Sequence, residues 1–147
     1  MTHLIAIDPG RSKCGLVLVD RDQACVVEGI VLPRQEVDVQ IETWIATVHG
    51  VERILLGDGT SSEDLRRGLK RFASVEVVQE KGTTLRARQR YWQLWPPRGW
   101  RRLIPKGIQI PPGNLDAVAA LVILEDELGF TCLWEGAPPT FRNEREP

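Results

Sequence analysis

Residues 3–32 read HLIAIDPGRSKCGLVLVDRDQACVVEGIVL, and this stretch contains three apolar runs separated by short polar gaps. The runs 3–8, 15–20 and 25–32 have the length and composition of β-strands. The gaps between them are too short for a crossover helix, so the pattern predicts three strands joined by antiparallel hairpins.

The rest of the chain alternates between helical and extended patterns. Apolar residues recur at helical spacing in 37–48 and 61–72, and short apolar runs at 53–57 and 75–79 indicate two further strands. Asn114 is expected to cap a last helix, which is apolar nearly all round. This order predicts an α/β fold with a five-stranded mixed sheet flanked by helices. Ligands of such sheets bind outside the carboxyl ends of the parallel strands.

The composition is that of a folded domain. The chain has 147 residues, of which 42% are hydrophobic and 27% are charged. Its longest apolar run, 117–124, is far shorter than the roughly 20 residues of a membrane span. Three cysteines and the absence of a signal-peptide pattern predict a cytoplasmic protein without a disulfide framework. We expect one domain over 1–135 and a flexible tail over 136–147.

The charge is concentrated in one segment. Residues 81–106 contain eight Lys and Arg residues, no Asp or Glu, and three of the five tryptophans. Basic side chains attract phosphates and aromatic rings stack on unpaired bases, so the segment suits nucleic acid. It equally suits a solvated basic loop whose tryptophans pack into the core, and the two interpretations are compatible.

Three carboxylates lie at the ends of predicted elements. Asp8 closes the first strand, Glu80 follows the fifth strand, and Asp116 lies in the first turn of the last helix. Each has a simple alternative role, as a turn former, a solvated side chain or a partner of the helix dipole. Together they form a set that would converge at one sheet edge and bind Mg²⁺ or Mn²⁺. Two such ions, about 4 Å apart, promote phosphodiester hydrolysis.

Three segments resemble a known family. IAIDPGRSKCGL (5–16), EKGTTLRAR (80–88) and LDAVAALVIL (115–124) are similar to motifs of the YqgF/RuvX and RuvC proteins. Those are Holliday-junction resolvase-like nucleases with the RNase H-like fold, and the resemblance spans roughly residues 3–128.

The resemblance implies that Asp8, Glu80 and Asp116 are the catalytic residues and bind Mg²⁺ or Mn²⁺, with two ions expected. It implies a metal-dependent nuclease acting on branched DNA or on pre-16S ribosomal RNA, without choosing between them. A symmetric four-way junction would favour a homodimer. No membrane partner is expected.

Two positions depart from the family pattern. Gln79 stands where the family often has an aspartate before the glutamate, and Gly113 stands where RuvC proteins have a second acid. Asp58 is therefore a tentative additional metal ligand, and its alternative is an Asp-Gly turn.

Basic and aromatic residues near the acids are expected to bind nucleic acid. Thr84 either contacts substrate or caps a short helix after Glu80. The expected nucleic-acid-binding residues are Lys13, Arg86, Arg88, Arg90, Trp92, Arg98, Arg101 and Arg102.

Three other functions have weaker support in the sequence. A non-catalytic nucleic-acid-binding module of the same fold is the main alternative. Loss of one acid would favour it, but this chain keeps all three. A sugar kinase of the actin-like fold also has an aspartate followed by glycines, but that fold needs two such domains. Gly10 and Gly15 do not form the Gly-x-Gly-x-x-Gly turn of a dinucleotide site.

Overall fold

The structure is a computed structural model that describes residues 2–142 except 60–61, 81, 106–110 and 112–113, and it leaves the side chain of Arg101 undescribed. The described strands are β1 (His3–Pro9), β2 (Lys13–Asp20), β3 (Cys25–Pro33), β4 (Arg53–Gly57) and β5 (Ser74–Val78). The described helices are η1 (Arg34–Glu36), α1 (Val37–Val48), α2 (Ser62–Leu69), α3 (Thr83–Leu94), η2 (Gly99–Leu103) and α4 (Asp116–Leu128), where η marks a 3₁₀ helix.

The five strands form one mixed sheet in the order β3-β2-β1-β4-β5. Strands β1, β2 and β3 pair antiparallel, whereas β4 is parallel to β1 and β5 is parallel to β4. The predicted five-stranded mixed sheet, with three antiparallel strands first, is therefore confirmed. The carboxyl ends of β1, β4 and β5 lie at the same edge of the sheet.

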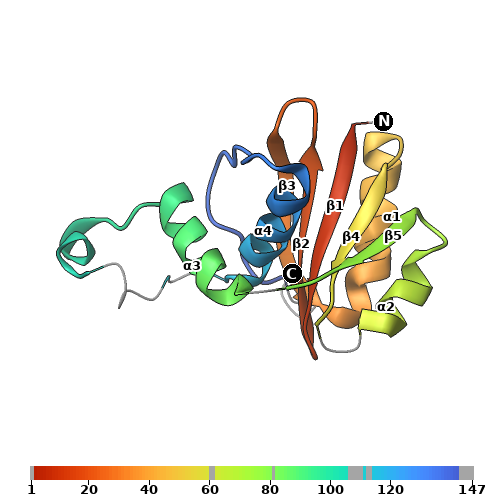
Figure 1. Cartoon of the computed structure of the whole chain (residues 1–147), viewed down its shortest axis with the longest axis horizontal. Coiled ribbons are helices and arrows are strands. Elements are labelled where there is room, and N and C mark those ends of the chain that lie inside the picture. Colours follow the sequence, from red (N-terminus) through yellow and green to blue (C-terminus); the bar gives the residue numbers. More distant parts are fainter. Residues whose placement is uncertain (1, 60–61, 81, 106–110, 112–113, 143–147) are drawn as a thin grey trace.

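Alternation along the strands divides the core into two layers. On β1, Ile5 and Ile7 pack in a cluster that includes residues of α1 and α2, whereas Leu4 and Ala6 pack in a cluster that includes residues of α4. Figure 1 shows α4 on one face of the sheet and α1 on the other. Because successive side chains of a strand point to opposite faces, this parity also decides where the polar residues at the strand ends point.

Helix α3 is the main difference from the sequence prediction, which placed at most a short helix after Glu80. The helix is 12 residues long. Ala87, Tyr91 and Trp92 lie at helical spacing and are buried in a cluster with Val118 and Ala119 of α4. The many arginines around this narrow apolar face hid its period in the sequence.

The predicted helix caps were also wrong. Leu115 occupies the N-cap position of α4 with no side-chain cap hydrogen bond, so Asn114 does not cap this helix. Gly82 occupies the N-cap position of α3, which places Thr84 inside the first turn. The expected start of α2 at Ser61 lies outside the described residues.

The segment after α4 returns along β3. The Leu133 N–H donates to Ala24 O at 2.8 Å, and the Arg142 N–H donates to Val31 O at 2.7 Å. Residues 140–142, within the expected flexible tail, thus contact β3, and residues 143–147 lie outside the described residues. The domain boundary at residue 135 stays a prediction. In the described part of the chain, no helix is long and apolar enough to cross a membrane.

Candidate metal centre

Asp8 is directed toward α4 by the parity of β1. Leu4 and Ala6 point to the α4 face, and Asp8 is the next residue of that row. In the antiparallel ladder Asp8 pairs with Gly15 of β2. The carboxylate is therefore at the carboxyl end of a central strand, on the face that α4 covers.

Gly15 allows the first turn of α4 to lie against the sheet beside Asp8. A Cβ atom at position 15 would overlap the backbone of Asp116, so no larger residue fits without a shift of the helix. This close approach brings Asp116 next to Asp8. In the sequence, Gly15 begins the second predicted strand and lies within the motif 5–16, but nothing in this local pattern indicates a close contact with a distant helix.

Two glycines at the end of β4 make room for Glu80. A Cβ atom on Gly57 would overlap the Glu80 carboxylate, and one on Gly59 would lie 3.3 Å from Glu80 Oε2. The Glu80 side chain therefore lies over the end of β4, although Glu80 itself follows β5. The pair of glycines immediately after a predicted strand was the available signal for this cradle.

Asp58, between these glycines, fixes the backbone at Glu80. Its N–H donates to Val78 O at 3.0 Å, and its Oδ1 accepts a hydrogen bond from the Glu80 N–H at 3.1 Å. Both contacts reach the segment after β5, so Asp58 is a positioning residue for Glu80 in this structure. Its tentative role as a metal ligand stays a prediction.

The three acids affect one another electrostatically. The pKa of Asp8 is raised to about 8, first by burial, then by a hydrogen bond with the Glu80 carboxyl and by the charges of Glu80 and Asp116. Glu80 Oε1 is buried and has no hydrogen-bond partner among the described residues. The raised pKa favours a protonated Asp8 beside the Glu80 carboxylate at neutral pH in the metal-free protein.

Lys13 adds a cation at the edge of this cluster. Its Nζ lies 3.5 Å from Asp116 Oδ2 and 5.9 Å from the centre of the Phe141 ring. Among the described residues, no three His, Cys, Asp or Glu side chains are already arranged to hold a metal ion. Asp8 and Glu80 form a contacting pair of hard oxygen donors, whereas Asp116 is paired with Lys13.

The donor chemistry nevertheless fits a divalent cation. A buried carboxylate oxygen without a described hydrogen-bond partner, next to a second carboxyl with a raised pKa, is relieved when a cation replaces the proton of that carboxyl. Oxygen-only donors are those that Mg²⁺ and Mn²⁺ prefer. Asp116 is the third acid that affects Asp8 electrostatically. To bind a cation, Asp116 would have to give up its ion pair with Lys13.

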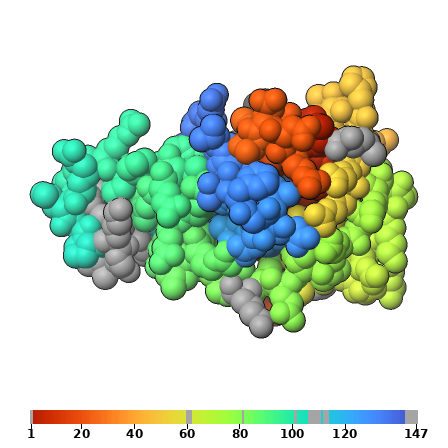
Figure 2. All heavy atoms as spheres, turned by 45° about the horizontal axis from the view of Figure 1, so that its top comes forward, coloured from red at the N-terminus to blue at the C-terminus, as the bar shows by residue number. Residues whose placement is uncertain are grey.

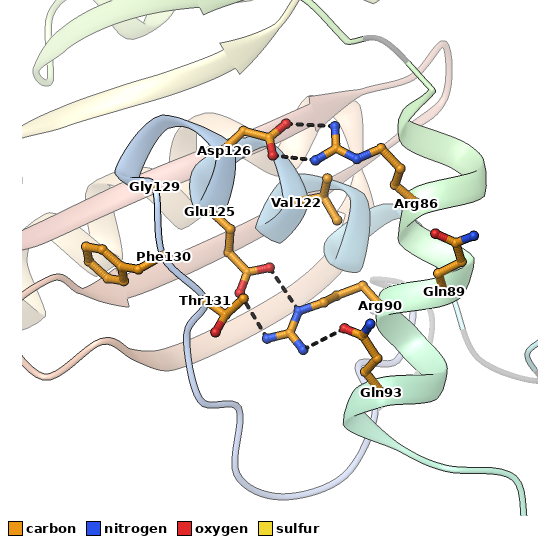
Figure 3. A pocket seen from close by; sticks show the side chains of 10 residues that line it. All are labelled: Arg86, Gln89, Arg90, Gln93, Val122, Glu125, Asp126, Gly129, Phe130 and Thr131. Atoms are coloured by element: carbon orange, nitrogen blue, oxygen red, sulfur yellow. Dashed lines mark hydrogen bonds and ion pairs between the residues drawn. The ribbon is translucent and has the colours of Figure 1, made fainter.

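Two arginines of the expected nucleic-acid-binding set join α3 to α4. Arg86 forms a two-point ion pair with Asp126, and Arg90 donates from Nε and Nη2 to the two oxygens of Glu125, each at 2.9 Å. Figure 3 shows both pairs crossing between the helices. Arg90 also donates to Cys132 O, and its side chain is only 14% exposed. These contacts hold the Arg90 guanidinium inside the fold, and its expected role in nucleic-acid binding stays a prediction.

The other residues that were expected to bind nucleic acid differ in how far they are exposed to solvent. Trp92 is buried at 6% exposure, so its ring cannot stack on a base. Arg88 is half-buried, whereas Arg98 and Arg102 are exposed. The side chain of Arg101 lies outside the described residues. The two interpretations of the basic segment are thus both represented, since Trp92 packs into the core and several arginines face solvent.

Comparisons with known proteins support the fold. No protein-family model matches the sequence, and no curated protein matches it significantly. Among solved structures, the chain is similar to T. thermophilus RuvC in complex with a Holliday junction substrate, with a TM-score of 0.52 and 12% identity. The match covers 90% of this chain and 99% of that chain. The chain therefore has the RNase H-like α/β fold that the sequence predicted, and the finer assignment to the YqgF proteins stays a prediction.

Proposed function

We propose that this protein is a divalent-metal-dependent nuclease that hydrolyses phosphodiester bonds in branched DNA or in structured ribosomal RNA, and that it is a YqgF-like relative of RuvC. The observation that supports this most strongly is the convergence of Asp8, Glu80 and Asp116 at one sheet edge. Burial first, and then the hydrogen bond with Glu80 and the charges of Glu80 and Asp116, raise the pKa of Asp8 to about 8. Gathering acids in a partly buried place is energetically unfavourable, and a bound cation would remove that cost by neutralising their charge.

In this proposal the residues around the site have three different roles: holding the metal, positioning Glu80 and attracting the phosphate. Asp8, Glu80 and Asp116 would hold one or two Mg²⁺ or Mn²⁺ ions. When bound, such ions activate a water and stabilise the leaving oxygen in phosphodiester hydrolysis. Asp58 keeps Glu80 in place through its backbone N–H. Lys13, whose side chain is 47% exposed beside Asp116, is placed to attract the phosphate that approaches the acids.

The substrate is the less defined part of the proposal. The similar RuvC structure contains a Holliday junction, and cutting such a junction symmetrically needs two sites, which a homodimer would provide. The YqgF-like motifs equally allow structured RNA. Both substrates offer a branched or partly unpaired strand to the basic surface of α3 and η2.

Cleavage of labelled substrates tests this function. A four-way DNA junction, single-stranded DNA and structured RNA would each be incubated with Mg²⁺, Mn²⁺ or EDTA. We expect cleavage with either metal, none in EDTA, and a loss of at least about a hundredfold in Asp8→Asn. Asp22→Asn is the matched control, because Asp22 is an exposed residue of the β2–β3 turn.

A non-catalytic nucleic-acid-binding module is the second candidate. The ion pair between Lys13 and Asp116 favours it, because Lys13 occupies one of the three carboxylates. Binding of the substrates without cleavage under every metal condition, equal in the wild type and in Asp8→Asn, would support this candidate and refute the nuclease.

A further inference from the structure

A groove at the far end of α3 is lined mainly by aromatic and proline side chains. Its volume is about 570 Å³, and Trp92, Trp95, Pro96 and Trp100 are among the residues that line it. This volume is within the range of about 300–1,000 Å³ that is typical of ligand sites. Figures 1 and 2 show the segment around η2 at one end of the molecule, away from the sheet.

Two buried donors on α3 lack acceptors. Trp92 is 6% exposed, and its Nε1–H meets no acceptor among the described residues. The Nε–H of Arg88 is also buried without a described acceptor. Arg88 precedes Trp92 by one helical turn and does not line the groove, so the Trp92 N–H is the donor that bears on it. A buried tryptophan N–H usually has a partner, which indicates that a ligand with oxygen or nitrogen acceptors belongs here.

The groove is positively charged. Arg98 is the charged residue among those that line it, and the described residues from Gly82 to Pro105 include no acid. Arg98 and Arg102 are both exposed. Trp100 is 69% exposed, and an exposed indole is a surface on which a base stacks. The groove therefore suits an anionic ligand that has a flat ring.

The chemical groups of a nucleotide match those of the groove. Its base stacks on an exposed indole, its carbonyl or ring nitrogen accepts a hydrogen bond, and its phosphates pair with arginines. A proline-rich peptide also binds aromatic grooves, but it has no phosphate for the arginines.

We propose that this groove binds one unpaired nucleotide of the substrate. The base stacks on Trp100 and accepts a hydrogen bond from Trp92, and the adjoining phosphate pairs with Arg98. The inference rests on the proposed nuclease function and deepens it, because it requires a substrate with a single-stranded segment. The 12 residues of α3, about 18 Å along the helix axis, lie between Glu80 and this groove.

Binding of a fluorescent oligonucleotide by the full-length protein tests the groove. The probe is a single strand containing 2-aminopurine, whose fluorescence falls when the base stacks, and EDTA prevents cleavage. We expect quenching on binding, and roughly tenfold weaker binding of a blunt duplex of equal length. Trp100→Ala is expected to weaken binding of the single strand about tenfold and to abolish the quenching.

Two further variants separate the contacts. Trp92→Phe keeps the buried ring and removes the N–H, so binding is expected to weaken several-fold while quenching remains. Arg98→Ala is expected to lower the slope of log affinity against log salt concentration by about one. Arg67→Ala on α2 is its matched control and is expected to change neither quantity.

Two results would overturn the groove proposal. One is an affinity and quenching that are the same in the wild type, Trp100→Ala and Trp92→Phe, with each variant's folding checked by its melting temperature. The other is a polyproline peptide that binds the groove more tightly than the oligonucleotide. Binding is measured in EDTA and is therefore independent of cleavage. If the groove binds the oligonucleotide but no substrate is cleaved with metal, only the nuclease proposal is refuted. Normal cleavage with no effect of these variants would refute the groove alone.

Discussion

Replacing Asp8 by Asn should stabilise the metal-free protein at neutral pH. The asparagine has nearly the shape of the aspartate, can donate a hydrogen bond to Glu80 and cannot ionise beside the other two acids. The folded protein holds the Asp8 proton to about pH 8, whereas the unfolded chain releases it near the ordinary value of 3.8. The free energy of unfolding of the wild type therefore falls as the pH rises between these two values.

The pKa shift sets the size of the effect. Each pH unit in this window changes the free energy of unfolding by at most about 1.4 kcal/mol for one proton. From pH 3.8 to about pH 7 this gives an upper bound of about 4 kcal/mol. Asp8 is partly exposed and coupled to Glu80, so we expect about 1–3 kcal/mol. A domain of this size then melts about 2–4 °C higher for each kcal/mol.

Thermal and urea unfolding in EDTA, at about pH 5 and about pH 7, measure this effect. Asp8→Asn should melt above the wild type at the higher pH, and the difference should shrink at the lower pH. Asp22→Asn should follow the wild type at both. Excess Mg²⁺ should raise the melting temperature of the wild type and leave Asp8→Asn unchanged. A variant that is less stable than the wild type at both pH values would refute the electrostatic reasoning.

Three further predictions address the surroundings of the site. Gly15→Ala should lower the free energy of unfolding by more than about 2 kcal/mol in urea titrations, because the new methyl group overlaps the backbone of α4; an unchanged midpoint would mean that α4 is free to shift. Arg90→Gln should lower it by about 3 kcal/mol, because Glu125 would keep a buried charge without its partner; a melting temperature equal to that of the wild type would contradict this structural role. Lys13→Met should tighten Mg²⁺ binding several-fold in calorimetry, because Lys13 competes for Asp116, and it should weaken binding of nucleic acid; weaker binding of both would show that Lys13 does not compete.

The sheet was predictable because its determinants are local. The three apolar runs of 3–32 and the short gaps between them allow only hairpins, and the next two strands are separated by strongly periodic helices. The end of each strand then placed Asp8 and Glu80 at one edge. Their arrangement on the α4 face follows from the parity of Leu4 and Ala6, which becomes visible only when the packing partner of that face is known.

The remaining features depend on contacts between distant segments. Gly15 and Gly57 are site residues because α4 and Glu80 approach them, and a single sequence does not reveal such approaches. The position of the Arg90 guanidinium depends on Glu125, a residue 35 positions later. The length of α3 was missed for the same reason, since its narrow apolar face is defined by its contact with α4.

Calorimetric titration of Mn²⁺ into the metal-free protein tests the central claim, which is that Asp8, Glu80 and Asp116 form a metal site. We predict binding to the wild type and to Asp22→Asn with release of protons at about pH 7, because the cation displaces the proton of Asp8. Asp8→Asn and Glu80→Gln should each bind at least tenfold more weakly. Equal Mn²⁺ binding by all four proteins, or none by the wild type with substrate present, would contradict the account.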